Sequence, residues 1–201
     1  MNENPIEIRD APLGDRLVQV ALELLAKEGI ESLTLRSLAR RAGVSHGAPA
    51  RHFRSLSDLR AEVAATGFRM LSEAIEKSNA ATSPEVGPMP RLAAAGRAYV
   101  DCALANPGLF ALMFRTGDLD PNNESLLRDA DAAFERLLEH VRMAQVSGWR
   151  EGRDSRQLAG SLWAAVHGLA TLWAEGAYPG AIPGVSLDDA MKSLFDLIAD
   201  V

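Results

Sequence analysis

The chain has 201 residues, of which 47 % are hydrophobic and 24 % are charged, and its formal net charge is -6. These values are ordinary for a soluble globular protein, and the length suffices for a small binding module followed by a larger domain. A single cysteine, Cys102, excludes a disulfide framework. The sequence has neither a long apolar run nor a signal-peptide core, so the cytoplasm is the expected location.

The spacing of apolar residues predicts an all-α fold. Ala, Leu, Glu and Arg dominate, and apolar residues recur at three- and four-residue spacing along most of the chain. Residues 1–12 are expected to form a flexible arm, and a first helix is predicted over residues 13–27, ended by Gly29 as a C-terminal cap. Thr34 is a good N-cap for a second helix over residues 35–42.

A tight turn at Gly43 should lead into a third helix over roughly residues 46–53, capped by Ser45 and with Pro49 in its first turn. A proline-containing loop is predicted near the C-terminus, over residues 176–185. The remaining helices are predicted over residues 55–79, 91–105, 107–115, 124–147, 154–175 and 186–199.

Residues 34–53 (TLRSLARRAGVSHGAPARHF) form a basic stretch without any Asp or Glu. Residues 1–57 hold 8 basic and 7 acidic side chains (net +1), whereas residues 58–201 hold 13 basic and 20 acidic ones (net -7). A local basic face is what a phosphate backbone requires, and an acidic remainder discourages non-specific contact. The alternative is a helical hairpin whose basic face is only solvated. The acid-free span and the Ala-Gly-Val turn with apolar residues on both sides favour DNA binding.

The pattern matches a helix-turn-helix, in which the second helix enters the DNA major groove and the first braces it across the backbone. The start of the second helix is small and polar, which permits close approach to base edges. Arg36 and Arg51 are expected to be mainly phosphate contacts. The predicted DNA-binding residues are Thr34, Arg36, Ser45, His46, Gly47, Ala48, Arg51 and His52.

The run LVQVALELLAKEGIESLTLRSLARRAGVSHGAPARHFRSLSDLRAEV resembles the N-terminal domain of the TetR family of bacterial transcriptional regulators. The resemblance covers about residues 13–63 without a gap. It implies an all-helical homodimer with a three-helix DNA-binding head and a variable ligand-binding domain. One position departs from the family pattern, because Ala50 stands where members usually have an aromatic residue that contacts the DNA backbone.

A second informative stretch is LAGSLWAAVHGLATLWAEG, residues 158–176, in which Trp163 and His167 share one helix face. With AGRAYVDCALANPGLFALMF upstream, it is similar to the WHG-type C-terminal domain of one branch of the TetR family, over roughly residues 91–176. We expect an apolar effector cavity in which His167 is an orienting polar group, and a satisfied hydrophobic core is the alternative. The predicted ligand-binding residues are Phe110, Met113, Phe114, Trp163 and His167.

Gly160, Ala164 and Gly168 form another stripe at four-residue spacing on the same predicted helix. Because glycine inside a helix costs about 1 kcal/mol relative to alanine, the stripe suggests close approach by a neighbouring helix. We interpret it as part of a homodimer seam formed with the helix over residues 124–147.

Other classes of function have less support. The four histidines, His46, His52, His140 and His167, are scattered, and the sequence contains no glycine-rich phosphate loop and no metal-ligand spacing. No enzymatic activity, cofactor or metal ion is therefore expected. A DNA-binding dimer without a small-molecule site, architectural or constitutive, remains the alternative.

The sequence thus predicts a ligand-responsive DNA-binding regulator that acts as a repressor. Residues 1–57 would form the helix-turn-helix domain, and residues 58–201 the ligand-binding and dimerisation domain. Its expected partners are a double-stranded DNA operator, a small apolar effector and a second copy of the chain.

Overall fold

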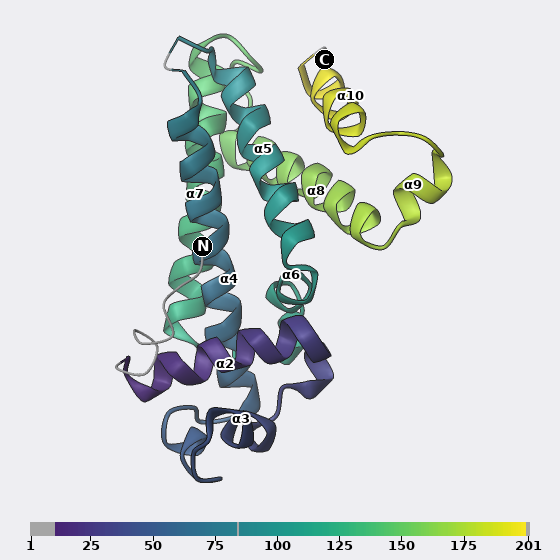
Figure 1. Cartoon of the computed structure of the whole chain (residues 1–201). Helices are drawn as coiled ribbons and strands as arrows, with labels where there is room; N and C mark the ends of the chain where they lie inside the picture. Colours follow the sequence, from purple (N-terminus) through teal and green to yellow (C-terminus); the bar gives the residue numbers. More distant parts are fainter. Residues whose placement is uncertain (1–10, 84, 200–201) are drawn as a thin grey trace. The chain divides into compact units, whose positions relative to one another are not determined.

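The computed structural model describes residues 11–83 and 85–199, and all regular elements in these ranges are helices (Figure 1). The all-α prediction is confirmed. The arm predicted over residues 1–12 lies outside the described residues except for its last two positions. The α-helices are α2 (Leu13–Glu28), α3 (Leu35–Ala42), α4 (Leu56–Ala81), α5 (Pro88–Ala105), α6 (Pro107–Met113), α7 (Glu124–Val146), α8 (Ser155–Ala174), α9 (Ala177–Ala181) and α10 (Leu187–Ala199). The short 3-10 helices are η1 (Ile30–Ser32), η2 (Pro49–Arg51) and η3 (Thr116–Asp118).

The chain divides into two compact units, and two helices contribute to both. The first unit holds the described residues up to Phe68 together with Asn106–Asp129. The second holds Arg69–Ala105 and the described residues from Ala130 onward. Both α4 and α7 therefore begin in the first unit and continue into the second. The predicted division after residue 57 separates two functions, DNA binding and effector binding with dimerisation. It stays a prediction, because the two compact units divide the chain at other residues.

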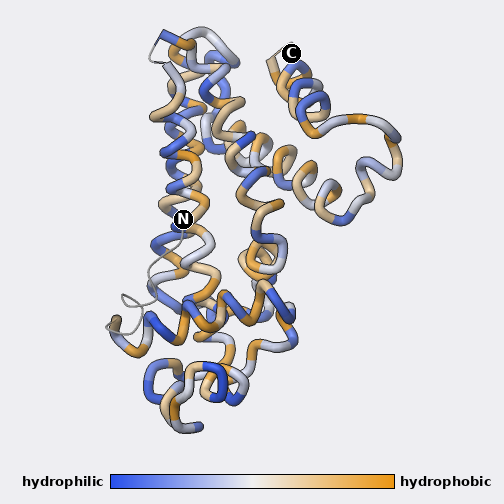
Figure 2. The backbone as a smooth tube through the Cα atoms, viewed as in Figure 1, coloured by the Kyte–Doolittle hydropathy of each residue, from blue (hydrophilic) through white to orange (hydrophobic). Residues whose placement is uncertain are grey.

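In the first unit α2 packs against α3 and α6. Along α2, hydrophobic and hydrophilic residues alternate with the helical period (Figure 2), and the apolar ones face inward. Gly29 ends α2 in a backbone conformation with φ of 77°, and its N–H donates to the carbonyl of Leu25 at 3.1 Å, as expected for a glycine cap. A Cβ atom on Gly108 would lie 3.1 Å from the same carbonyl oxygen, so α6 approaches the α2 backbone closely. The buried residues of α2 are Leu17, Ala21, Leu24 and Leu25.

In the second unit α5 packs against α8, and α10 packs against α5 (Figure 1). The aromatic ring of Phe195 on α10 lies over Gly96 of α5, where an added Cβ atom would be 2.6 Å from the ring Cζ atom. Arg97 forms ion pairs with Asp101 and with Asp188 in the first turn of α10, which fixes the start of α10 on α5. The central core cluster consists of Leu92, Leu138, Val141, Ala144, Ala159 and Leu162.

The prediction of an α-helix over residues 46–53 is wrong, because this segment forms a turn followed by the three-residue helix η2. The N–H groups of Ala48 and His52 donate three residues back, to the carbonyls of Ser45 at 2.9 Å and Pro49 at 3.0 Å. Pro49 has no N–H to donate, and Gly47 is a poor helix former, so an α-helical ladder does not develop. We call residues 45–53 the reading segment.

The prediction of a loop over residues 176–185 is also wrong in part, because this segment contains the five-residue helix α9. Gly176 adopts a left-handed conformation with φ of 73° and its carbonyl accepts the N–H of Gly180 at 3.0 Å. Pro179 lies in the first turn of α9, where a missing N–H has no helical partner to lose. The rings of Trp173 and Tyr178 pack at 5.6 Å between centroids, so a tertiary contact stabilises this short helix.

Candidate nucleic-acid interface and effector residues

The beginning of α3 is fixed by a reciprocal cap between Thr34, the predicted N-cap, and Ser37. The N–H of Ser37 donates to the Thr34 hydroxyl at 3.0 Å, and the N–H of Thr34 donates to the Ser37 hydroxyl at 3.1 Å. Gly43 ends α3 in the left-handed conformation with φ of 67°, and the N–H of Val44 donates to the carbonyl of Ala39 at 3.0 Å. Local bonds at both ends therefore determine the length of α3 and the direction in which the chain leaves it.

Two buried side chains anchor the far half of the reading segment. Pro49 is fully buried, and Phe53 is only 5 % exposed. The N–H of Phe53 donates to the Pro49 carbonyl at 2.9 Å, so the two buried residues also bond to each other. Between these anchors the chain turns its small and polar side chains outward.

All eight predicted DNA-binding residues lie in the first unit. Ala48 is partly buried, and the other seven are exposed. A Cβ atom on Gly47 would meet no other atom within 4 Å, so this position leaves open space beside the turn. His52 lies next to the start of α2, where a Cβ atom on Gly14 would be 3.5 Å from its Nδ1 atom. The exposed predicted residues are Thr34, Arg36, Ser45, His46, Gly47, Arg51 and His52.

The arginines of this region fall into two groups. Arg54 binds Asp58 and Asp120, which holds the pKa of Arg54 above its usual value and neutralises its charge. Arg41 approaches Glu28 at 3.8 Å. Three others, Arg36, Arg40 and Arg51, are exposed and form no ion pair with any residue that the structure describes.

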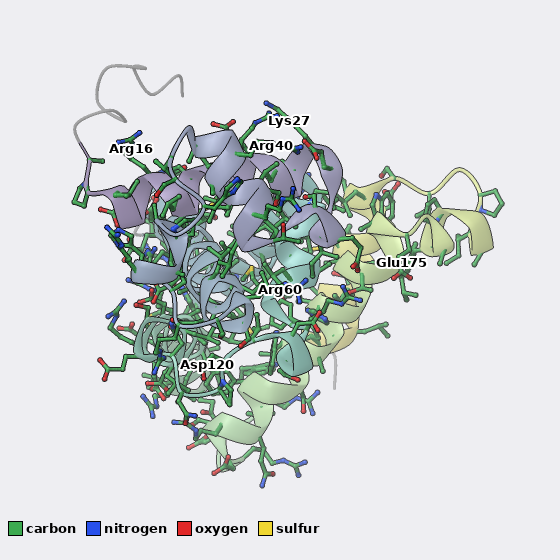
Figure 3. All side chains as sticks on the ribbon, turned by 90° about the horizontal axis from the view of Figure 1, so that it is seen from below. Arg16, Lys27, Arg40, Arg60, Asp120 and Glu175 are labelled. Atoms are coloured by element: carbon green, nitrogen blue, oxygen red, sulfur yellow. The ribbon has the colours of Figure 1, made fainter. Side chains whose placement is uncertain are left out.

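We call Arg36, Arg40 and Arg51 the arginine face. Figure 3 views the chain from the side on which α3 lies, and Arg40 is labelled there. The list of DNA-binding residues predicted from the sequence leaves out Arg40. The sequence does indicate Arg40, because Arg36 and Arg40 are four residues apart and therefore share one side of α3.

Three of the predicted effector residues lie in the first unit, around the middle of α4. The rings of Phe110 and Phe114 pack at 5.1 Å between centroids, and Phe114 packs edge-on against Phe68 at 5.7 Å. Met113 lies over Gly67, where an added Cβ atom would be 2.5 Å from the Met113 sulfur. With Met113 in this position there is no room for a Cβ atom at position 67, and these side chains form an aromatic and thioether surface typical of adaptable apolar sites.

The other two, Trp163 and His167, lie in the second unit, where they share a partner that the sequence analysis did not select. The Tyr99 hydroxyl is 2.8 Å from His167 Nδ1 and accepts the indole N–H of Trp163 at 3.3 Å. Burial raises the pKa of Tyr99 and lowers the pKa of His167, so both groups are neutral at pH 7. The pairing of Tyr99 with these residues depends on α5 lying beside α8. The ring of Trp163 also packs edge-on against Phe134.

Two classes of feature are not found in the described part of the chain. Among residues 11–83 and 85–199, no group of three or more His, Cys, Asp or Glu side chains is arranged to hold a metal ion. Within the same ranges, no helix has the length and hydrophobicity needed to cross a membrane.

Two family models match the chain. The model of bacterial regulatory proteins of the tetR family matches residues 17–63, which include α3 and the reading segment. The model of the tetracyclin repressor-like C-terminal domain matches residues 92–198, which is more than half of the chain. No curated protein matches the chain significantly in sequence.

Solved structures match the chain over nearly its whole length. A protein of unknown function from Rhodococcus sp. RHA1 is 31 % identical, with 98 % of both chains covered and a TM-score of 0.82. The TetR family transcriptional regulator PfmR from Thermus thermophilus is 20 % identical, covering 92 % of this chain and 98 % of its own, with a TM-score of 0.66. The transcriptional regulator FadR from Bacillus subtilis, solved in complex with stearoyl-CoA, is 16 % identical, covering 92 % of this chain and 97 % of its own, with a TM-score of 0.70. The last two similarities concern the fold.

Proposed function

Since the chain belongs to the TetR family of bacterial DNA-binding transcription regulators, we propose that it is a homodimeric repressor released from its operator by a small apolar effector. The observation that carries the DNA-binding part is the arginine face beside an exposed, small-residue reading segment. Such a surface supplies charge for phosphates and close approach for bases. The cytoplasm, where the operator is accessible, is the proposed location.

In this proposal the reading segments of two copies enter successive major grooves of a pseudo-palindromic operator, about 34–36 Å apart. Ser45, His46, Gly47 and Ala48 approach base edges, because they lead the segment and carry small or polar side chains. Arg36 and Arg51 bind phosphates on either side, and Thr34 and His52 complete the contacts. The short η2 helix places these groups in a tight turn rather than along an extended helix face.

The proposed dimer seam is the face of α8 that carries Gly160, Ala164 and Gly168. A Cβ atom on either glycine would meet no described atom within 4 Å, so packing within the chain does not explain these small residues. Ala164 is exposed, and Leu172 on the same side is 46 % exposed. A second copy whose helix approaches closely would explain both the small residues and the exposed apolar one.

We expect Gly168→Leu to weaken dimerisation by at least about tenfold, since a buried isobutyl group forces the two helices apart. The substitution should leave the single chain folded, because leucine favours helix more than glycine does. Sedimentation velocity over a range of protein concentrations measures the effect. Gly117→Leu is the matched control, because its Cβ position is equally open and it lies in the first unit. A Gly168→Leu chain that dimerises as tightly as wild type would rule out this seam.

We propose effector contacts at Phe110, Met113 and Phe114 within the first unit, and at Trp163 and His167, with Tyr99 added, within the second. The apolar character of the first group and the neutral polar groups of the second suit an effector with hydrocarbon and polar parts. The binding of stearoyl-CoA by the FadR neighbour makes long-chain acyl compounds the first class to test. The effector must bind the DNA-incompetent state more tightly, since equal affinity for both states shifts nothing. A displacement of α4, which begins at Leu56 with two residues between it and the reading segment, would transmit the change.

Selection of bound sequences from a random DNA pool tests both parts of this function. We expect enrichment of a palindromic site, and its release when stearoyl-CoA or a fraction of metabolite extract is added, with free coenzyme A as the negative control. Trp163→Ala should retain DNA binding and respond less to the effector. Failure to enrich any sequence would contradict DNA recognition. Enrichment without release by any fraction would support the constitutive DNA-binding dimer.

A further inference from the structure

A buried amide joins the beginning of α7 to the beginning of α4 in the first unit. Asn123 is only 4 % exposed, and its Nδ2 group donates to Asp58 Oδ1 at 3.0 Å and to Glu62 Oε1 at 2.8 Å. Its Oδ1 atom accepts the backbone N–H of Leu126 at 2.8 Å, so the same side chain caps the first turn of α7. We call Asn123, Asp58 and Glu62 the Asn123 clamp.

Asp58 extends this connection to the end of the reading segment. Its Oδ2 atom accepts the backbone N–H of Arg54, the residue directly after Phe53, at 2.9 Å. The Arg54 guanidinium contacts Asp58 at 3.4 Å and Asp120 at 3.0 Å. The N–H of Asp120 in turn donates to the Ser57 carbonyl at 3.1 Å. The loop before α7 is therefore bonded to the backbone that links the reading segment to α4.

The Asp58 carboxylate carries a negative charge that its hydrogen-bond donors stabilise. Burial by itself raises the pKa of Asp58, but hydrogen bonds from Arg54 and Asn123 outweigh that effect and lower this pKa below its usual value. A carboxylate that is only 6 % exposed is left poorly satisfied when one of its donors moves away. A displacement of α7 that withdrew the Asn123 amide would therefore cost free energy at Asp58 and weaken the clamp.

We propose that Asn123 is a positioning residue through which the effector-dependent state of α7 controls the DNA affinity of the reading segment. This inference rests on the proposed function and adds a second connection to the one through α4. α7 begins at Glu124, directly after Asn123, and continues into the second unit. A rotation or axial shift of α7 withdraws the amide from Asp58, which releases the backbone of Arg54 and with it the end of the reading segment.

The sharpest test is Asn123→Asp, which keeps the size and shape of the side chain. At about pH 8 the new carboxylate faces Asp58 and Glu62 and opens the clamp, and we expect operator affinity to fall about tenfold. At about pH 5.5 the new carboxyl, whose pKa like charges raise, takes a proton, and its single O–H restores one of the two hydrogen bonds that the amide donates. Operator affinity should then recover to within about threefold of wild type at the same pH, measured by fluorescence anisotropy.

Asn122→Asp is the matched control, because it makes the same change at the preceding residue, whose side chain is exposed. We expect it to bind the operator like wild type at both pH values. Asn123→Ala has no carboxyl group to protonate, so its operator affinity should be reduced at both pH values. If thermal melting shows that Asn123→Asp is unfolded at high pH, Asn123→Ala takes its place in that measurement.

The inference is overturned if Asn123→Ala binds as tightly as wild type, if the loss in folded Asn123→Asp does not respond to pH, or if Asn122→Asp loses as much. A wild-type chain that selects no DNA sequence overturns the proposed function, and this inference with it, before any variant is made.

Discussion

The double variant Arg36→Ala/Arg51→Ala is expected to bind the selected operator about 100-fold more weakly than wild type, and each single variant about tenfold more weakly. Both arginines are exposed and have no ion pair among the described residues, so their charge is available to phosphates. Each phosphate contact contributes about 0.9 to the slope of log affinity against log salt. The slope should therefore fall by that amount for each arginine removed, with similar losses on specific and non-specific DNA.

Two further variants separate charge from geometry in this prediction. Arg51→Lys keeps the positive charge and should retain most of the salt slope. Arg41→Ala is the matched control for Arg36→Ala, because both residues lie on α3 and Arg41 is already near Glu28. Its effect on operator affinity should stay within about twofold. If Arg51→Ala instead leaves the slope unchanged and relaxes discrimination at one base pair, Arg51 reads a base and the phosphate assignment is wrong.

Phe53→Ala should destabilise the protein by about 3–5 kcal/mol, a large fraction of the roughly 5–15 kcal/mol typical of folded proteins. Phe53 is buried at the end of the reading segment, and its removal leaves a cavity next to the equally buried Pro49. The reading segment has a three-residue 3-10 helix in place of a regular α-helix, so its side-chain anchors determine its position. Specific DNA binding should therefore be lost even at temperatures at which the chain stays folded.

Urea unfolding monitored by circular dichroism measures this change, and two variants calibrate it. Phe53→Leu, which retains most of the buried volume, should cost about 1 kcal/mol. His52→Ala changes the exposed neighbouring residue and should stay within about 0.5 kcal/mol. A Phe53→Ala cost below about 1 kcal/mol would mean that backbone bonds alone hold the segment.

Elements with strong local signals were predicted almost to the residue. α3 covers Leu35–Ala42 as expected, because Thr34 caps one end and Gly43 stops the other through bonds that span only a few residues. The start of α8 follows the same rule, since the Asp154 carboxylate accepts the N–H of Gln157 at 2.8 Å. The prediction of a helix over residues 46–53 is wrong for an equally local reason. Pro49 has no N–H to donate, and this loss destabilises an α-helix there more than the sequence analysis assumed.

The candidate sites were predictable only in part. The exposed and mostly basic residues of the DNA surface follow from the helical period and from the acid-free composition of residues 34–53. Tyr99 could not be paired with His167 from the sequence, because the two are 68 positions apart on different helices. The division of the five predicted effector residues between two units likewise depends on where α6 packs, which no periodic pattern specifies.

By itself, the amino-acid sequence determined the all-α fold, most helix ends and the basic stretch, because caps, helical periodicity and local charge act over a few neighbouring residues. Only the tertiary structure decided which of those charges remain available. It pairs Arg54 with Asp58 and Asp120 and leaves Arg36, Arg40 and Arg51 unpaired among the described residues. It also brings Asn123 to Asp58, 65 positions away. Such pairings arise from the packing of elements distant in sequence, and a single sequence carries no local pattern that specifies them.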